Sequence, residues 1–227
     1  MTSGLELDAF RREATALTQA LAGLSEDDWG LPTRCEPWTV RELLGHVRVA
    51  IGWLPGMLAA AEPEQADVSA VEYYRPDERF AAATNVARIG LAQDYAAKQA
   101  GGAALVQDFT AACHRVDQLC RAERAGRVVL TRHGDAMLLS DFLVTRVVEV
   151  AVHGLDLADA LRRAPWLTRQ AADTVAELLL GPEWTIALHE LGWDRLEFIR
   201  KATGRRALEP ADITRVERLG IRWLTLG

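Results

Sequence analysis

The chain has 227 residues, of which 49% are hydrophobic, enough for one domain with an appendage or for two small domains. A formal net charge of −6, without a basic block, argues against nucleic acid as a partner. The longest uncharged stretch near a predicted helix, residues 49–61, contains Pro55 and is too short to cross a bilayer, which argues against a membrane protein.

The N-terminus and the cysteines indicate the compartment. The segment "MTSGLELDAFRREAT" lacks the basic-then-apolar pattern of a signal peptide. The three cysteines form no CxxC pair, and their odd number does not fit a disulfide framework. We therefore expect a cytoplasmic protein, monomeric by default, with Cys113 and Cys120 as buried free thiols on one helical face.

The first predicted element is a helix over residues 6–23, because apolar side chains recur there at steps of three and four residues. A turn rich in glycine, proline and acidic residues follows. The next helix begins at Thr39, where "TVRE" is a capping box in which Glu42 can reach back to the Thr39 amide. We expect this helix to run to about residue 60, with a bend at Pro55.

A long connection then leads to a predicted helix over 77–99, which "AGG" at 100–102 ends. An amphipathic helix is predicted over 103–124, and "RVVLTRHGDAMLL" predicts a short hairpin or an extended loop. Ser140 is expected to cap the following helix, whose end Pro165 marks.

Four long helices make an all-α four-helix bundle the simplest fold for most of the chain. Its helices are expected over residues 6–23, 39–60, 103–124 and 140–162. More than 40 residues separate the second helix from the third, so we expect a long crossover connection in place of a hairpin. The tail predicts further helices over 168–180 and near 183–202. We therefore divide the chain into a helical bundle, 1–165, and a helical C-terminal extension, 166–227.

The helix predicted over 140–162 carries charged residues on one side of an otherwise apolar sequence. At about 100° per residue, Arg146, His153 and Asp156 all fall within roughly 60° of Glu149. An amphipathic helix that turns these residues to water would have the same pattern. What faces this side of the helix decides between a buried site and a solvated surface.

His46 lies on the apolar face of the second predicted helix, which turns it toward the bundle interior. With a rise of about 1.5 Å per residue, His46 can reach the same level of the bundle as Glu149 and His153. Glu149 and His153 are i,i+4 neighbours with Cβ atoms about 5–6 Å apart, close enough to hold one ion. Two imidazoles and a carboxylate form a three-ligand site with open positions, typical of catalytic zinc and suited to iron or nickel. The alternatives are a surface Glu–His ion pair and a core histidine.

Two segments, "DDWGLPTRCEPWTVRELLGHV" and "LSDFLVTRVVEVAVHGLDLADAL", together resemble the DinB-like, mycothiol-dependent maleylpyruvate isomerase family. The resemblance covers about residues 1–165 and implies a divalent metal, usually zinc, held by His46, Glu149 and His153. It also implies mycothiol, a low-molecular-weight thiol, as co-substrate, and an electrophilic small molecule as substrate. The isomerase carries a C-terminal α+β domain, whereas this tail predicts helices, although "FIRKATGRRAL" echoes a family segment. We therefore extend neither maleylpyruvate as substrate nor a C-terminal catalytic arginine to this chain.

The resemblance implies an enzyme in which a metal-bound thiolate adds to an electrophilic carbon, as an S-transferase or an isomerase. We assign Arg146 to a substrate or cofactor carboxylate, the alternative being a buried salt bridge to Asp156 or Glu42. Asp156, one turn beyond His153, is assigned to orienting that imidazole, the alternative being a charge that stabilises the helix. Two other functions stay open: a hydrolase that activates water on the metal, and a non-catalytic protein that senses metal or thiol.

The remaining candidate residues receive minor roles. Trp53 and Met57 continue the stripe of His46 and are expected in the core. The crossover connection could cover the metal end with three of its residues: Tyr73, Tyr74 and Arg75. Three histidines lack partners at ligand spacing and are expected to be structural or surface residues: His114, His133 and His189.

Overall fold

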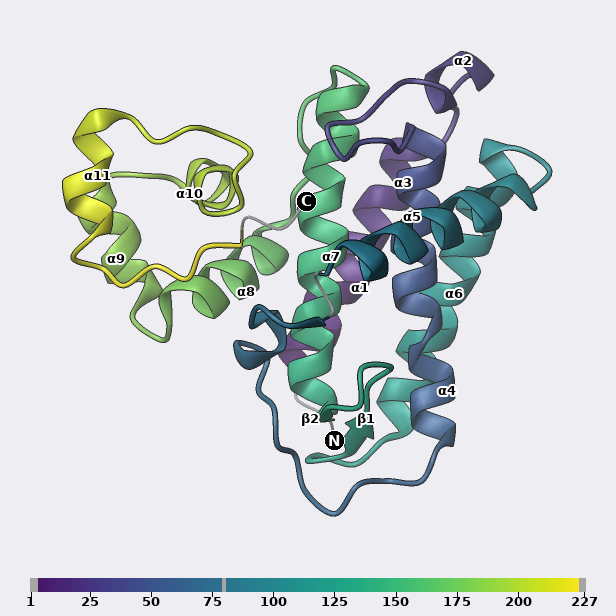
Figure 1. The fold of residues 1–227 in the computed structure, drawn as a ribbon, viewed down its shortest axis with the longest axis horizontal. Helices are drawn as coiled ribbons and strands as arrows, with labels where there is room; N and C mark the ends of the chain where they lie inside the picture. The colour runs from purple at the N-terminus through teal and green to yellow at the C-terminus, as the bar shows by residue number, and fades with distance from the viewer. Residues whose placement is uncertain (1–3, 79–80, 225–227) are drawn as a thin grey trace.

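The computed structural model describes residues 4–78 and 81–224, and these residues form a helical molecule with one small hairpin (Figure 1). In chain order the elements are α1 (Gly4–Leu21), α2 (Glu26–Trp29), α3 (Val40–Gly52), α4 (Leu54–Ala59), η1 (Glu72–Tyr74), α5 (Ala82–Ala97), α6 (Gly102–Ala122), β1 (Val128–Leu130), β2 (Ala136–Leu138), α7 (Leu139–Ala160), α8 (Arg169–Leu180), α9 (Trp184–Leu191), α10 (Arg195–Ala202) and α11 (Pro210–Val216). The predicted all-α fold is confirmed.

Four long helices form the bundle that the sequence predicts. α1 packs against α6 and α7, and α3 packs against the same two helices. The four helices run along a common direction in Figure 1. Each contributes a fully buried side chain to one core, from which water is excluded: Phe10, Leu43, Phe109 and Leu143. The predicted four-helix bundle is therefore confirmed.

α5 lies within the crossover connection and packs against α3. The close approach requires glycine in α3, because a Cβ at Gly45 would stand 2.9 Å from the Ala92 carbonyl oxygen. The sequence predicts this helix over 77–99, but it begins at Ala82, and residues 79–80 lie outside the described part of the chain. α5 thereby covers the flank of the helix that carries His46.

The start of α7 differs from the prediction. α7 begins directly after β2, so Leu138, and not Ser140, precedes its first helical residue. The hairpin provides the cap, since the Leu139 amide donates to the Arg127 carbonyl at 2.8 Å. β1 and β2 pair antiparallel, which confirms the predicted hairpin. The hairpin therefore fixes the entry into the helix that carries Glu149.

Two predicted helices are each divided in the structure. α3 ends at Gly52, and α4 follows with Pro55 in its first turn, near the predicted bend. The helix predicted near 183–202 becomes α9 and α10. Gly192 adopts a left-handed φ of 69° after α9, and Asp194 caps α10 with its side chain.

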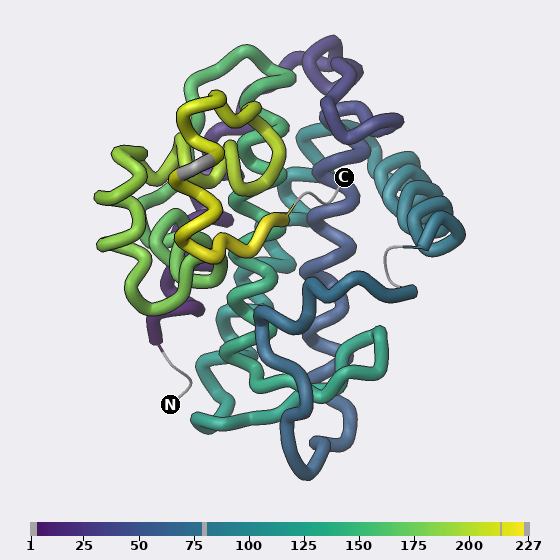
Figure 2. Tube along the Cα trace, turned by 60° about the vertical axis from the view of Figure 1, so that its left-hand side comes forward, coloured from purple at the N-terminus to yellow at the C-terminus, as the bar shows by residue number. Residues whose placement is uncertain are grey.

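The C-terminal extension packs on one side of the bundle. α8 contacts α1 and α7, and Figures 1 and 2 both place α8–α11 on that side. Thr168 caps α8, and its amide and hydroxyl donate to Glu13 of α1 at 2.8 and 2.5 Å. None of the described helices combines the length and apolar character that a membrane span requires.

Candidate metal centre

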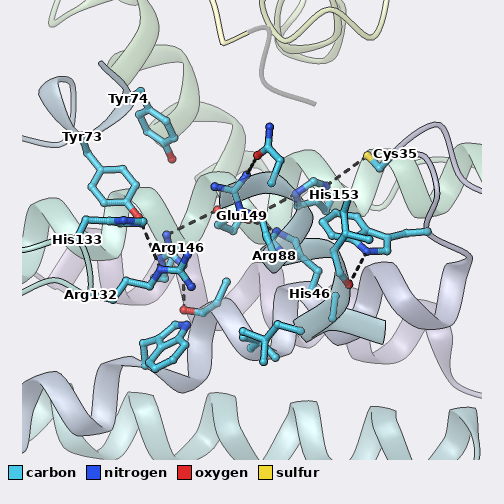
Figure 3. Close-up of a pocket in the computed structure, with 18 of the residues that line it drawn as sticks. Cys35, His46, Tyr73, Tyr74, Arg88, Arg132, His133, Arg146, Glu149 and His153 are labelled. Carbon is cyan, nitrogen blue, oxygen red and sulfur yellow. Dashed lines mark hydrogen bonds and ion pairs between the residues drawn. The ribbon is translucent and has the colours of Figure 1, made fainter. Parts of the chain in front are cut away.

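Three side chains that the sequence assigns to one ion meet between α3 and α7 (Figure 3). His46 projects from the middle of α3, and Trp38 stacks on its ring with centroids 4.6 Å apart. Glu149 and His153 come from successive turns of α7. Glu149 Oε2 lies 3.4 Å from His46 Nε2 and 3.5 Å from His153 Nε2. The predicted juxtaposition is present, and metal ligation by these residues stays a prediction.

The donor atoms and their spacing fit a divalent metal. With bonds of about 2.0–2.1 Å, neighbouring nitrogen and oxygen ligands of a tetrahedral zinc lie about 3.4 Å apart. The two distances from Glu149 Oε2 match this value. The same oxygen is buried and accepts no hydrogen bond from the described residues. Such a carboxylate oxygen is costly unless it binds something else, and a cation between the three side chains would satisfy it.

Burial and charge set the protonation of these three groups. Burial acts to raise the pKa of the Glu149 carboxyl, but His46 and Arg146 hold it well below its usual range. Burial lowers the pKa of His46. Burial acts to lower the pKa of His153 too, but the hydrogen bond to Asp156 and the charge on Glu149 raise it to about 10. Glu149 is therefore an anion and His46 a neutral imidazole, the forms in which both bind a metal.

Asp156 contacts His153 on the side opposite Glu149. Its Oδ2 accepts a hydrogen bond from His153 Nδ1 at 3.0 Å, and the residue is completely buried. At neutral pH the raised pKa of His153 keeps a proton on each ring nitrogen, and Asp156 holds the one at Nδ1, so a cation would displace the proton of Nε2, the nitrogen that faces Glu149. This is the contact that the predicted orienting role of Asp156 requires.

A second group of ligand atoms comes from Cys35, His153 and Asp156. Cys35 Sγ donates to Asp156 Oδ2 at 3.2 Å, and Arg205 donates to both Asp156 oxygens at 3.0 and 2.7 Å. Because a guanidinium already neutralises this carboxylate, we assign no metal to this group. The sequence reasoning missed both Cys35 and Arg205. The available signals were the two family-like segments that contain them, "LPTRCEPW" and "FIRKATGRRAL".

Arg146 is buried between Glu149 and the C-terminal end of α3. Its Nη1 donates to the Ala50 carbonyl at 2.9 Å, and its Nη2 lies 3.7 Å from Glu149 Oε1. The buried salt bridge that is the alternative role of Arg146 is present, but its acidic partner is Glu149 and not Asp156 or Glu42. The guanidinium lines the cavity beside the triad, where it can also reach a ligand. Its role toward a substrate carboxylate stays a prediction.

The triad borders a cavity of about 460 Å³, a volume that suits a small molecule. Figure 3 shows His46 and His153 toward one end of it and Arg132 and His133 toward the other. Arg146 lies between these two groups. The cavity therefore joins a candidate metal centre to a cationic end.

Two residues line this cavity although the sequence predicts other places for them, and a third has both positions. Met57 is buried in the core, as expected, and also lines the cavity, whereas Trp53, expected in the core, is exposed and lines the cavity where α3 gives way to α4. His133 is expected to be structural or on the surface, but the turn between β1 and β2 brings it to the cavity wall. These differences arise at the helix break and at the hairpin turn. The periodicity of the sequence does not show where such a break or turn brings the side chains next to it.

The connection before α5 reaches the cavity, as the sequence allows. Tyr73 and Tyr74 of η1 both line it, and the Tyr74 hydroxyl lies 3.5 Å from the Thr145 carbonyl oxygen. Burial raises the pKa of Tyr74 well above its ordinary value, so its hydroxyl stays a donor. Arg75 does not line the cavity and pairs with Asp135 at 2.6 Å.

The other predicted residues lie away from the cavity wall. His114 of α6 and His189 of α9 are both exposed, in agreement with a surface position. Cys113 and Cys120 are buried free thiols, as expected, and burial raises the pKa of each to about 12.

The fold and the site together define a DinB-like helical bundle with a His–Glu–His group in its cavity. The mycothiol maleylpyruvate isomerase N-terminal domain family matches residues 10–158. The chain belongs to this family, which confirms the resemblance that the sequence shows.

The chain is also similar to two further proteins and to solved structures. Two Mycobacterium tuberculosis proteins, uncharacterized proteins MT0041 and Rv0036c, are each 28% identical to this chain, covering 96% of it and 91% of their own length. Crystal structures of mycothiol-dependent maleylpyruvate isomerase and of a mutant of it align with TM-scores of 0.51 and 0.53, at 20% and 18% identity. The alignments cover 75% of this chain and 66% of each of those chains, and they show a shared fold.

Proposed function

We propose that this chain is a metal-dependent enzyme in which a low-molecular-weight thiol, mycothiol, adds to an electrophilic small molecule. The observation that carries the proposal is the His46–Glu149–His153 group, with a buried carboxylate oxygen that accepts no hydrogen bond from the described residues. Its place on the wall of a small-molecule cavity supports catalysis over structural binding. Family membership supports mycothiol as the thiol.

His46, Glu149 and His153 would hold the metal, with zinc as the first choice and iron or nickel as alternatives suited to the same ligands. When bound, such a metal lowers the pKa of a coordinated thiol and so supplies a thiolate nucleophile at neutral pH. Asp156 keeps the His153 proton on Nδ1. Arg146 keeps Glu149 ionised through its positive charge.

The cationic end of the cavity would bind the electrophile. Arg132 contacts His133 and lies over the Trp53 ring, 5.5 Å from its centroid, and it pairs with no carboxylate of the described residues. A carboxylate on the substrate would supply that missing partner. We therefore assign anion recognition to Arg132 together with Arg146, the residue that the sequence selects for this role.

A conjugated carbonyl compound fits the donors that line the cavity. Addition of the thiolate forms a carbon–sulfur bond, and the electron pair of the double bond moves to the carbonyl oxygen. The Tyr74 hydroxyl lies on the cavity wall, and it would stabilise this oxygen by turning its proton away from the Thr145 carbonyl, 3.5 Å away. Loss of the thiolate after rotation about the former double bond gives isomerisation, whereas its retention, with a proton from solvent added to the enolate carbon, gives an S-conjugate.

The first experiment is elemental analysis of the purified wild type beside His46→Ala, Glu149→Ala and the control His189→Ala. We expect about one equivalent of metal in the wild type and the control, and none in the other two variants. A wild type that stays metal-free after incubation with zinc, iron and nickel would overturn the proposal. Turnover of an electrophile by the loaded wild type without any thiol would favour the hydrolase instead.

A further inference from the structure

Asp156 is the point at which the C-terminal extension reaches the candidate metal centre. Arg205, which follows α10, donates Nε to Oδ1 at 3.0 Å and Nη2 to Oδ2 at 2.7 Å. The same Oδ2 accepts the hydrogen bond from His153 Nδ1. One buried carboxylate thus joins a guanidinium of the extension to an imidazole of the triad.

The Arg205 side chain is itself fixed from several directions. It is 3% exposed, and its Nη1 donates to the Thr203 carbonyl at 2.6 Å. Gly204 adopts a left-handed φ of 71°, which turns the chain at this point. Arg34, in the loop before α3, donates to the Gly204 carbonyl at 2.8 Å. A bidentate guanidinium held in this way fixes the plane of the carboxylate that it binds.

We propose that Arg205 is a positioning residue of the metal centre, which sets metal affinity by fixing the His153 ring through Asp156. The inference rests on the proposed function, because it requires His153 to be a metal ligand. With both Asp156 oxygens fixed by Arg205, Oδ2 is held toward Nδ1, and the ring cannot turn Nε2 away from Glu149. Loss of such a partner behind a ligating histidine costs about 10–100-fold in metal affinity.

A second arginine of the extension provides a matched control. Arg200 of α10 forms two hydrogen bonds, each 2.7 Å long, with Asp159 of α7. This pair docks the extension on the same helix of the bundle but contacts no member of the triad. Removing Arg200 therefore tests docking alone, whereas removing Arg205 tests docking together with positioning.

The experiment measures the zinc dissociation constant of the full chain by competition with a chromogenic chelator. Arg205→Ala is expected to weaken zinc binding by about 10–100-fold, and Arg200→Ala to leave it unchanged while lowering Tm. Arg205→Lys keeps the charge without the bidentate geometry, and its affinity should fall between the two. In the Asp156→Asn background, Arg205→Ala should weaken zinc binding by less than about a further twofold, because Asp156→Asn has already removed the carboxylate that connects Arg205 to His153.

The visible absorption of the cobalt-loaded protein gives an independent readout of the geometry around the ion. It should change in Arg205→Ala and stay unchanged in Arg200→Ala. If Arg205→Ala does not fold, as judged by circular dichroism, Arg205→Lys decides the question. A folded Arg205 variant with the zinc affinity and the cobalt spectrum of the wild type overturns the inference. An equal loss of zinc affinity in Arg200→Ala overturns it too, as do losses of affinity from Arg205→Ala and Asp156→Asn that are fully additive. A wild type that binds neither zinc nor cobalt overturns the proposed function as well.

Discussion

Glu13 is a buried carboxyl that should make the stability of the fold depend on pH. Burial raises its pKa from 4.5 to about 7, against the hydrogen bonds that it accepts from Thr168. The folded state therefore binds this proton more tightly than the unfolded state. The contribution of Glu13 to the free energy of unfolding is therefore complete below pH 4.5 and is lost as the pH rises to about 7. Each pKa unit is worth about 1.4 kcal/mol, so the loss amounts to about 3 kcal/mol.

Glu13→Gln isolates this effect, because glutamine has nearly the shape of the protonated carboxyl and its carbonyl oxygen can still accept from Thr168. Urea denaturation in EDTA should give equal free energies of unfolding for variant and wild type at pH 4.5. At pH 8 the variant should be more stable by up to about 3 kcal/mol. Glu64→Gln, at an exposed position, serves as the control and should show no such divergence. A difference between Glu13→Gln and wild type that is the same at both pH values would refute the reasoning.

Three further predictions concern the metal, the substrate and the packing of α5. Zinc at 100 times its dissociation constant should stabilise the wild type by about 2.7 kcal/mol, so EDTA should lower the calorimetric Tm of the wild type but not of His46→Ala. Arg132→Ala should raise KM for an anionic electrophile by about tenfold at unchanged metal content, and an unchanged KM would remove Arg132 from substrate binding. Gly45→Ala should lower the free energy of unfolding by about 1–2 kcal/mol, since its Cβ would meet the Ala92 carbonyl. Gly90→Ala should raise the free energy of unfolding by up to about 1 kcal/mol, because its Cβ would meet no atom within 4 Å beyond the adjoining backbone, and a loss of stability there would contradict the packing argument.

The parts of the fold and site that the sequence predicts depend on local geometry. The capping box at Thr39 and Glu42 is present as expected, because both partners lie within one turn. Glu149 and His153 share a face because four residues make slightly more than one helical turn. His46 meets them because each apolar stripe must face the core, which leaves few relative orientations for α3 and α7.

The parts that the sequence does not predict depend on contacts between distant segments. His133 reaches the cavity only because a hairpin folds back beside η1, and no helical period encodes that return. Trp53 lines the cavity because α3 stops one residue before it. Arg205 lies 49 residues beyond Asp156, in the predicted C-terminal extension, and no sequence pattern there predicts a contact with Asp156. Tertiary packing, and not local propensity, places these three side chains.

The two acidic residues of α7 show how one helix can carry two different kinds of carboxylate. Asp156 is matched by Arg205, His153 and Cys35, so its charge is compensated within the protein. Among the described residues, the ion-pair partners of Glu149 are the more distant Arg146 guanidinium and two imidazoles, and its Oε2 accepts no hydrogen bond from them. A helix with only structural ion pairs would compensate both charges in the same way. The difference between them supports the proposal that Glu149, and not Asp156, would be the carboxylate ligand of a metal.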